Sequence, residues 1–155
     1  MILGVGVDVC SVERFDAMLR RRPGVLDRIL RQAEQVRRDG GRRSVASLAA
    51  RFAAKEALIK AFGGVPGWVW RDAEVRSDPR GRPGFRLHGN VAARAAALGV
   101  TSVGLSITHD AGLAMAFVVL ESLEPGSSPA SPIGQASVAT SALDGWRPGA
   151  GDPDA

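Results

Sequence analysis

The chain has 155 residues, of which 45% are hydrophobic, and this length and composition indicate one globular domain with a mainly aliphatic core. It has no long apolar run, no signal-peptide pattern and a single cysteine, Cys10, so we expect a cytoplasmic protein without a membrane span or an internal disulfide. The net charge of +4 favours an anionic partner, although solubility alone would explain it equally well.

The composition divides the chain into two parts. Residues 1–122 contain the periodic apolar segments, and we expect them to form the single domain. Residues 123–155 are rich in Pro, Gly, Ser and Ala, which is typical of a flexible tail.

The first third of the domain predicts one strand and two helices. Residues 2–9 alternate in a way that puts Leu and Val on one face and Gly and Asp on the other, as in a strand. Ser11 can cap a helix that runs from residue 12 to the arginine cluster at 20–22, and a second short helix is expected over 26–37.

The strongest predicted helix covers residues 45–62, with Ser44 as its cap and two glycines after its end. The later elements are expected to be strands over 73–76 and 85–87 with a turn at 78–81 between them, a helix from Asn90 to Leu98, and a hairpin of strands 103–108 and 113–120. This order predicts an α+β fold in which a small, largely antiparallel sheet packs on one long helix.

Asp8 interrupts a valine-rich strand, where aspartate is unfavourable. The glycines at 4 and 6 share its face and leave room beside the backbone. Two interpretations stay open at this point: Asp8 turns outward to cap the following helix, or it binds a ligand.

Glu56 lies on the apolar side of the long helix. With about 100° per residue, it falls within a stripe formed by Val45, Leu48, Ala49, Phe52 and Ile59. A carboxylate in a buried stripe is costly unless it is paired, protonated or bound to metal. A pair with Lys60 would contribute only about 0.2–0.5 kcal/mol if exposed, so a metal or phosphate neighbour explains Glu56 better. Arg51 and Lys55 flank the stripe and suit an anionic ligand, although such charges are usually solvated.

A third polar segment, residues 105–110, ends a predicted strand at the hairpin turn. It contains Ser106, Thr108 and His109. Polar groups that converge on a turn can bind a ligand, but the same residue types are ordinary in turns. Taken alone, this segment favours the ordinary turn.

Together, segments 4–8, 51–57 and 105–110 resemble the holo-acyl-carrier-protein synthase family of phosphopantetheinyl transferases. The specific features are the Lys55-Glu56-Ala57 core and a lysine four residues after the glutamate, and the resemblance covers about residues 2–121. It implies that the phosphopantetheine arm of coenzyme A moves to a serine of an apo carrier protein, with release of adenosine 3′,5′-bisphosphate. Mg²⁺ with two carboxylates and a diphosphate fits such a transfer.

The resemblance also implies a role for individual residues. It gives Asp8 and Glu56 as magnesium ligands, and Glu56, Lys60 and His109 as catalytic residues. The coenzyme-binding residues that it implies are Asp8, Arg51, Lys55, Glu56, Lys60, Gly63, Gly64, Ser106, Thr108 and His109. The carrier-binding residues that it implies are Arg14, Met18, Arg21 and Arg22. Glu56, a water on the metal and His109 remain three alternative bases for the serine proton.

Family members of this size imply a homotrimer with the coenzyme site between subunits. Segment 30–34 matches the family pattern Phe-Thr-x-x-Glu only weakly, and the tail extends beyond the usual end. The main alternative is a non-catalytic module that binds coenzyme A or a nucleotide. A nucleic-acid-binding protein is disfavoured because stacking aromatic residues and a binding motif are missing.

Overall fold

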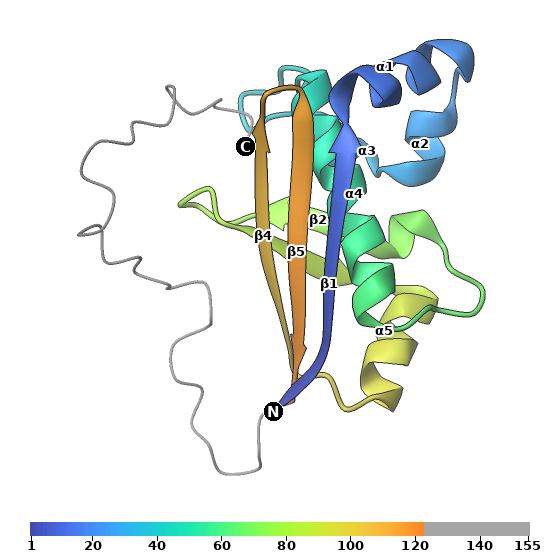
Figure 1. The fold of residues 1–155 in the computed structure, drawn as a ribbon, viewed down its shortest axis with the longest axis vertical. Helices are drawn as coiled ribbons and strands as arrows, with labels where there is room; N and C mark the ends of the chain where they lie inside the picture. The colour runs from blue at the N-terminus through green and yellow to red at the C-terminus, as the bar shows by residue number, and fades with distance from the viewer. Residues whose placement is uncertain (123–155) are drawn as a thin grey trace.

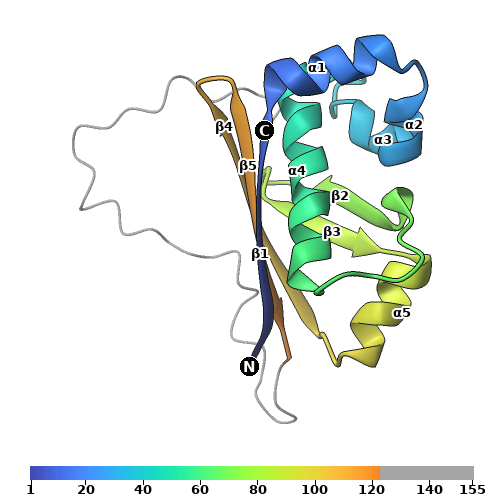
Figure 2. The ribbon, with the colours of Figure 1, turned by 45° about the vertical axis from the view of Figure 1, so that its right-hand side comes forward.

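The computed structural model describes residues 1–122. Its main sheet contains three antiparallel strands, β1 (Ile2–Ser11), β5 (Leu113–Glu121) and β4 (Ser102–Asp110), in that spatial order. Figure 1 shows β5 at the centre, with β1 and β4 as the two edges. Figure 2 shows all the helices on one side of this sheet.

The other elements of the described chain are short and surround one long helix, α4 (Val45–Ala61). They are α1 (Val12–Arg21), α2 (Val25–Ile29), α3 (Gln32–Gln35), the 3-10 helix η1 (Trp70–Asp72), α5 (Gly89–Ala97), and an antiparallel pair of strands, β2 (Ala73–Ser77) and β3 (Pro83–Leu87). The predicted α+β class with antiparallel sheets is confirmed. Within residues 1–122, no helix is both long enough and apolar enough to cross a membrane.

Both ends of α4 are capped as the sequence predicts. The Ser44 side chain accepts a hydrogen bond from the Ser47 N–H at the start. At the other end, the N–H of Gly63 donates to Lys60 O and that of Gly64 donates to Ile59 O, both at 3.0 Å. Gly63 has a φ of +66°, the left-handed conformation that this Schellman-type end requires.

β1 packs on α4 through its glycine face. A Cβ atom at Gly4 would overlap the Ala61 carbonyl oxygen, and one at Gly6 would overlap that of Ala57. The two backbones can therefore approach this closely only because both positions lack a side chain. The alanines that face β1 from the helix are fully or nearly fully buried.

The opposite face of the main sheet is apolar and exposed. Val5, Val7 and Val9 of β1 are 48–50% exposed, and Met115 and Phe117 of β5 are 43% and 44% exposed. This is a large set of apolar side chains for one face of a small domain, and such faces usually mark an interaction surface.

Two local predictions were wrong. The helix expected over 26–37 is divided into α2 and α3, because Leu30 and Arg31 adopt extended conformations between them. Asn90 was expected to cap the last helix, but His88 occupies that position. The Asn90 side chain instead donates to the Gly67 carbonyl at 2.6 Å, which holds the loop after α4.

The other helix and strand predictions are confirmed to within two residues, including Ser11 as the cap of α1. Ser11 Oγ accepts from the N–H of Arg14 at 3.3 Å. The predicted flexible tail over 123–155 lies outside the described residues.

Gly6→Ala should destabilise the fold strongly. The added methyl group meets helix backbone, which cannot move aside as a flexible side chain would. We therefore expect the free energy of unfolding to fall by an amount near or above the top of the usual range of about 1–3 kcal/mol for overpacking. Urea unfolding followed by tryptophan fluorescence measures it. Gly84→Ala in β3 is the matched control, since a Cβ there meets nothing within 4 Å. Equal stability of the two variants would contradict this account of the β1–α4 contact.

Candidate active site

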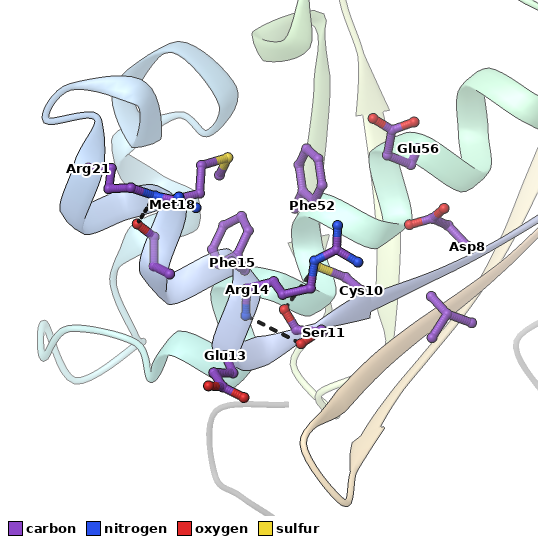
Figure 3. Close-up of a pocket in the computed structure, with 12 residues that line it drawn as sticks. Asp8, Cys10, Ser11, Glu13, Arg14, Phe15, Met18, Arg21, Phe52 and Glu56 are labelled. Atoms are coloured by element: carbon purple, nitrogen blue, oxygen red, sulfur yellow. Dashed lines mark hydrogen bonds between the residues drawn. The ribbon is translucent and has the colours of Figure 1, made fainter.

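A groove opens where β1 passes into α1, beside the middle of α4, and Figure 3 shows the side chains around it. Its volume is about 590 Å³. The groove brings together both predicted metal carboxylates and three of the four predicted carrier-binding residues. Its lining residues are Asp8, Val9, Cys10, Ser11, Glu13, Arg14, Phe15, Ala17, Met18, Arg21, Phe52 and Glu56.

Asp8 does not cap the following helix, because Ser11 has that role. Its carboxylate instead pairs with Lys60 of α4, with 2.8 Å between Asp8 Oδ1 and Lys60 Nζ. The same ammonium group donates to the Val7 carbonyl at 3.0 Å. The Asp8 side chain is 15% exposed and that of Lys60 is 52% exposed, so the ion pair lies at the edge of the groove.

Glu56 is half-buried, and the prediction that it lies in the core-facing stripe needs correction. Phe52 and Ile59, which share that stripe, are also only partly buried, whereas the fully buried positions include Ala53, Ala54 and Ala57. The sheet and the smaller elements surround α4 on several sides, and small alanines allow their close approach. Leu48 and Ala49 of the stripe are buried, whereas its part at Phe52, Glu56 and Ile59 is more open, and Phe52 and Glu56 line the groove there.

Burial raises the pKa of Glu56, and the neighbouring Asp8 carboxylate raises it further, while Lys60 lowers it. No hydrogen bond or ion pair to the Glu56 side chain occurs among residues 1–122. Two carboxylates of the same site therefore share one nearby ammonium group, and that group contacts Asp8. This arrangement leaves a need for positive charge at Glu56.

These two carboxylates fit a magnesium ion. Within residues 1–122 there is no cluster of three or more His, Cys, Asp or Glu side chains that could enclose a metal. Mg²⁺ usually takes one or two protein carboxylates and completes its coordination with water and substrate phosphates. Hard oxygen donors that border an open groove match that requirement.

Cys10 also borders the groove, but it is not a candidate nucleophile. Burial and the nearby Asp8 carboxylate raise the pKa of its thiol. The protonated form therefore predominates at neutral pH, and a thiol is a poor nucleophile.

Lys55 lies outside the groove, which corrects its predicted role at a coenzyme phosphate. Its side chain is 0% exposed, and Nζ lies 3.0 Å from Glu34 Oε2. It also donates to the carbonyl oxygens of Ile29 (2.7 Å) and Trp70 (3.0 Å). Burial lowers the pKa of Lys55, with Glu34 opposing that shift. Lys55 is thus a structural residue that joins α4 to the segments before and after it.

Glu34 is the residue that sequence reasoning missed. It is 1% exposed and accepts hydrogen bonds from the backbone N–H groups of Arg31 (2.7 Å) and Val75 (3.0 Å), in addition to Lys55. The only signal in the sequence was its place in the segment that matches the Phe-Thr-x-x-Glu pattern weakly. Its acceptor contacts and burial explain why a glutamate is present there.

Arg51 and His109 lie together, but at a different cavity. It has a volume of about 150 Å³ and is lined by Ser47, Ala50, Arg51, Gly81, Pro83, Ile107 and His109. Arg51 is 2% exposed and donates to Ser47 Oγ at 2.6 Å. This cavity shares no lining residue with the groove. It lies beside β4, and β5 separates β4 from β1 in the sheet.

The late motif is divided between the two faces of β4. His109 points toward the helix side, whereas Ser106 and Thr108 are exposed on the apolar outer face. There they lie opposite Phe117 and Met115 of β5. Within one chain, these hydroxyl groups therefore belong neither to the groove nor to the cavity of His109.

The remaining predicted residues lie at the C-terminal ends of α1 and α4. Arg22 is the C-cap of α1 and does not line the groove. Gly63 and Gly64 follow the end of α4, one turn beyond Lys60. The aromatic wall of the groove was not predicted: Phe15 and Phe52 pack with ring centroids 5.4 Å apart.

Comparisons with known proteins agree on one family. The family model of the 4′-phosphopantetheinyl transferase superfamily matches residues 4–118. A holo-[acyl-carrier-protein] synthase of Streptomyces avermitilis is 54% identical over 120 residues, which cover 77% of this chain and 98% of that relative. A solved synthase structure from Neisseria meningitidis is 31% identical with a TM-score of 0.70, and the match covers 78% of this chain and 99% of that one. Another from Bacillus anthracis, in complex with CoA (3′,5′-ADP), is 36% identical with a TM-score of 0.63, covering 79% and 99%.

Proposed function

Because the chain belongs to the holo-[acyl-carrier-protein] synthase family of the 4′-phosphopantetheinyl transferase superfamily, we propose that it transfers the phosphopantetheine arm of coenzyme A to a serine of an apo acyl carrier protein, with Mg²⁺. The family predicted from the three motifs is confirmed. The observation that carries the proposal is the common groove of Asp8, Glu56 and the arginines of α1. It combines ligands for a metal–diphosphate with a basic surface for a protein substrate.

In the proposed reaction, the serine oxygen of the carrier attacks the β-phosphorus of coenzyme A. The phosphoanhydride bond breaks, and adenosine 3′,5′-bisphosphate leaves. The Bacillus anthracis relative, whose complex contains CoA (3′,5′-ADP), supports this leaving group. The nucleophile comes from the partner, so the enzyme needs no nucleophile of its own.

The chain's own residues position and neutralise the diphosphate. Asp8 and Glu56 would hold the Mg²⁺, which supplies positive charge to the phosphate oxygens when it is bound. Lys60 stands beside Asp8 and can donate to a phosphate as a second source of charge. Glu56, water or His109 would accept the serine proton, and only Glu56 of these two side chains borders the groove of its own chain.

We propose that three copies of the chain form the complete enzyme. The exposed apolar face of β1 and β5 gives each copy a surface to bury. The predicted coenzyme residues are divided between the groove at the β1 edge and the cavity of Arg51 and His109 at the β4 edge. A trimer in which the β4 edge of one subunit meets the groove of its neighbour would unite them.

The carrier protein is proposed to dock on α1. Arg14, Met18 and Arg21 line the groove from this helix, and Figure 3 shows Arg14 nearest to the carboxylates and Arg21 at the far end. An acidic helix of the carrier would complement the arginines and place its serine near Asp8 and Glu56. Arg22 lies at the end of the same helix and extends the basic surface.

Incubation with coenzyme A, Mg²⁺ and an apo carrier should add one phosphopantetheine arm to the mass of the carrier. Glu56→Gln should lower this transfer by about a hundredfold or more, as expected for loss of a phosphate-neutralising metal ligand. Its folded state should be at least as stable as wild type at neutral pH. The raised pKa means that folding penalises the charged form, and glutamine removes that penalty.

Asp27→Asn is the control, because it also neutralises a carboxylate but lies on α2, outside the groove. It should retain transfer. No mass gain with several carriers, while coenzyme A still binds, would favour the non-catalytic module instead. Full activity of Glu56→Gln with Mg²⁺ would remove Glu56 from the metal site.

Reversal of Arg14 and Arg21 to glutamate should raise the KM for the carrier by about tenfold or more and leave coenzyme A binding nearly unchanged, since the reversal turns charge attraction into repulsion. Arg28→Glu on α2 is a control for each single reversal, Arg14→Glu or Arg21→Glu, because it makes the same charge change outside the groove. Steady-state kinetics and direct coenzyme A titration give the two readouts. An equal loss of both would contradict docking on α1.

A mixture of Asp8→Asn and His109→Ala chains tests the shared site. Each variant should be nearly inactive alone. After joint unfolding and refolding, a trimer that takes Asp8 and His109 from different subunits should recover about one quarter of wild-type activity. No recovery, with mixed trimers demonstrated by mass, would place both residues in one subunit's site, and full activity of His109→Ala alone would remove His109 from the site.

A further inference from the structure

Two carboxylates, Asp8 and Glu56, lie near Lys60, and its ammonium group contacts only that of Asp8. Glu56 precedes it by one turn on α4, yet Lys60 Nζ pairs with Asp8 across the helix–strand contact, at 2.8 Å. It is also held by the Val7 carbonyl at 3.0 Å. Within residues 1–122, this is the only ion pair of Asp8. The ammonium group thus occupies a carboxylate oxygen, Asp8 Oδ1, that could otherwise bind a metal.

The charges of Asp8, Glu56 and Lys60 favour the binding of a cation in addition to the Lys60 ammonium group, and the bound cation then favours an anion. Asp8, Glu56 and Lys60 together carry one net negative charge, and Glu56 is the carboxylate without an ion pair. A divalent cation would reverse the sign of the cluster. Two cations cannot share Asp8 closely without repulsion, so the ammonium group would leave and need an anionic partner.

The Lys60 side chain is free to make that move. It is 52% exposed, whereas Asp8 is 15% exposed and remains in place. The backbone of Lys60 is fixed, because its carbonyl accepts the N–H of Gly63 in the helix end. The ammonium group can therefore turn toward solvent while the helix keeps its length and position.

We propose that Lys60 is the internal counter-ion of Asp8 and passes from Asp8 to a phosphate of coenzyme A when a divalent cation binds Asp8. This inference rests on the proposed function, because the diphosphate is its second partner. It makes metal and coenzyme binding cooperative: whichever binds first breaks the Lys60–Asp8 pair, and the other then binds without that cost. Such coupling is reciprocal.

The first test uses inorganic pyrophosphate as the probe with the full chain in EDTA. Asp8→Asn and Glu56→Gln remove the same charge from the same site, but only Asp8→Asn breaks the ion pair of Lys60. Asp8→Asn should therefore bind pyrophosphate about two- to fivefold tighter than Glu56→Gln, the range expected for a partly exposed ion pair. In a Lys60→Met background, the two variants should bind pyrophosphate equally.

The second test measures Mn²⁺ binding by electron paramagnetic resonance, with and without coenzyme A. Lys60→Met should bind Mn²⁺ alone about two- to fivefold tighter than wild type, because the competing cation is gone. Coenzyme A should then increase its Mn²⁺ affinity by a smaller factor than in wild type. Lys60→Arg, which keeps the charge, should restore the wild-type pattern.

Equal pyrophosphate affinity of Asp8→Asn and Glu56→Gln, with Lys60 present, would overturn the proposal. Weaker or unchanged Mn²⁺ binding by Lys60→Met would overturn it as well, and thermal unfolding checks that each variant is folded. These binding readouts do not need catalysis. If they succeed while wild type transfers no arm to any carrier, the proposed function fails and the counter-ion role stands.

Discussion

The close contact between α4 and the glycine face of β1 determines where the site residues lie. The two elements run in opposite directions, so that Gly4 meets Ala61 and Gly6 meets Ala57. Two residues of a strand advance about 6.7 Å and four residues of a helix advance about 6 Å, so the two repeats stay nearly in register. The next position on this face is Asp8, which reaches the helix between Glu56 and Lys60. A side chain at either glycine would push β1 away from α4 and so move Asp8 away from Glu56 and Lys60.

The adjacent residues Lys55 and Glu56 show how one helix can serve both the stability of the fold and the proposed site. Adjacent residues on a helix point about 100° apart. Lys55 is therefore directed into the interior, where Glu34 and two backbone carbonyls bind it, while Glu56 faces the groove. The buried ion pair connects α4 to the start of α3 and to β2, and this fixes the rotation of the helix that carries Glu56. The Lys-Glu motif, which the resemblance assigns to the coenzyme site, therefore contains one residue with a structural role, Lys55.

The sequence predicted elements well where periodicity and caps agreed. The strand that contains Asp8, the helix after Ser44 and the final hairpin all had both signals. The sequence did not identify the buried side of α4 correctly, because alanine gives little amphipathic contrast. The stripe predicted to face the core is buried at Leu48 and Ala49 but only partly buried at Phe52, Glu56 and Ile59. The fate of Lys55 depended on Glu34, 21 residues away, and no local pattern indicates such a contact. The division of the late motif could have been predicted, since alternate residues of a strand face opposite sides.

The separation of the two sheet edges is the basis of the proposal that one chain is an incomplete enzyme. β1 and β4 are the two edges of a three-stranded sheet, and the predicted ligands of the coenzyme lie at both edges. In the proposed trimer, association would bring the β4 edge of one chain to the β1 edge of another, and burial of the apolar face of β1 and β5 would stabilise it. The apolar residues exposed on one chain would therefore stabilise the association that brings Arg51 and His109 to the groove of a neighbour.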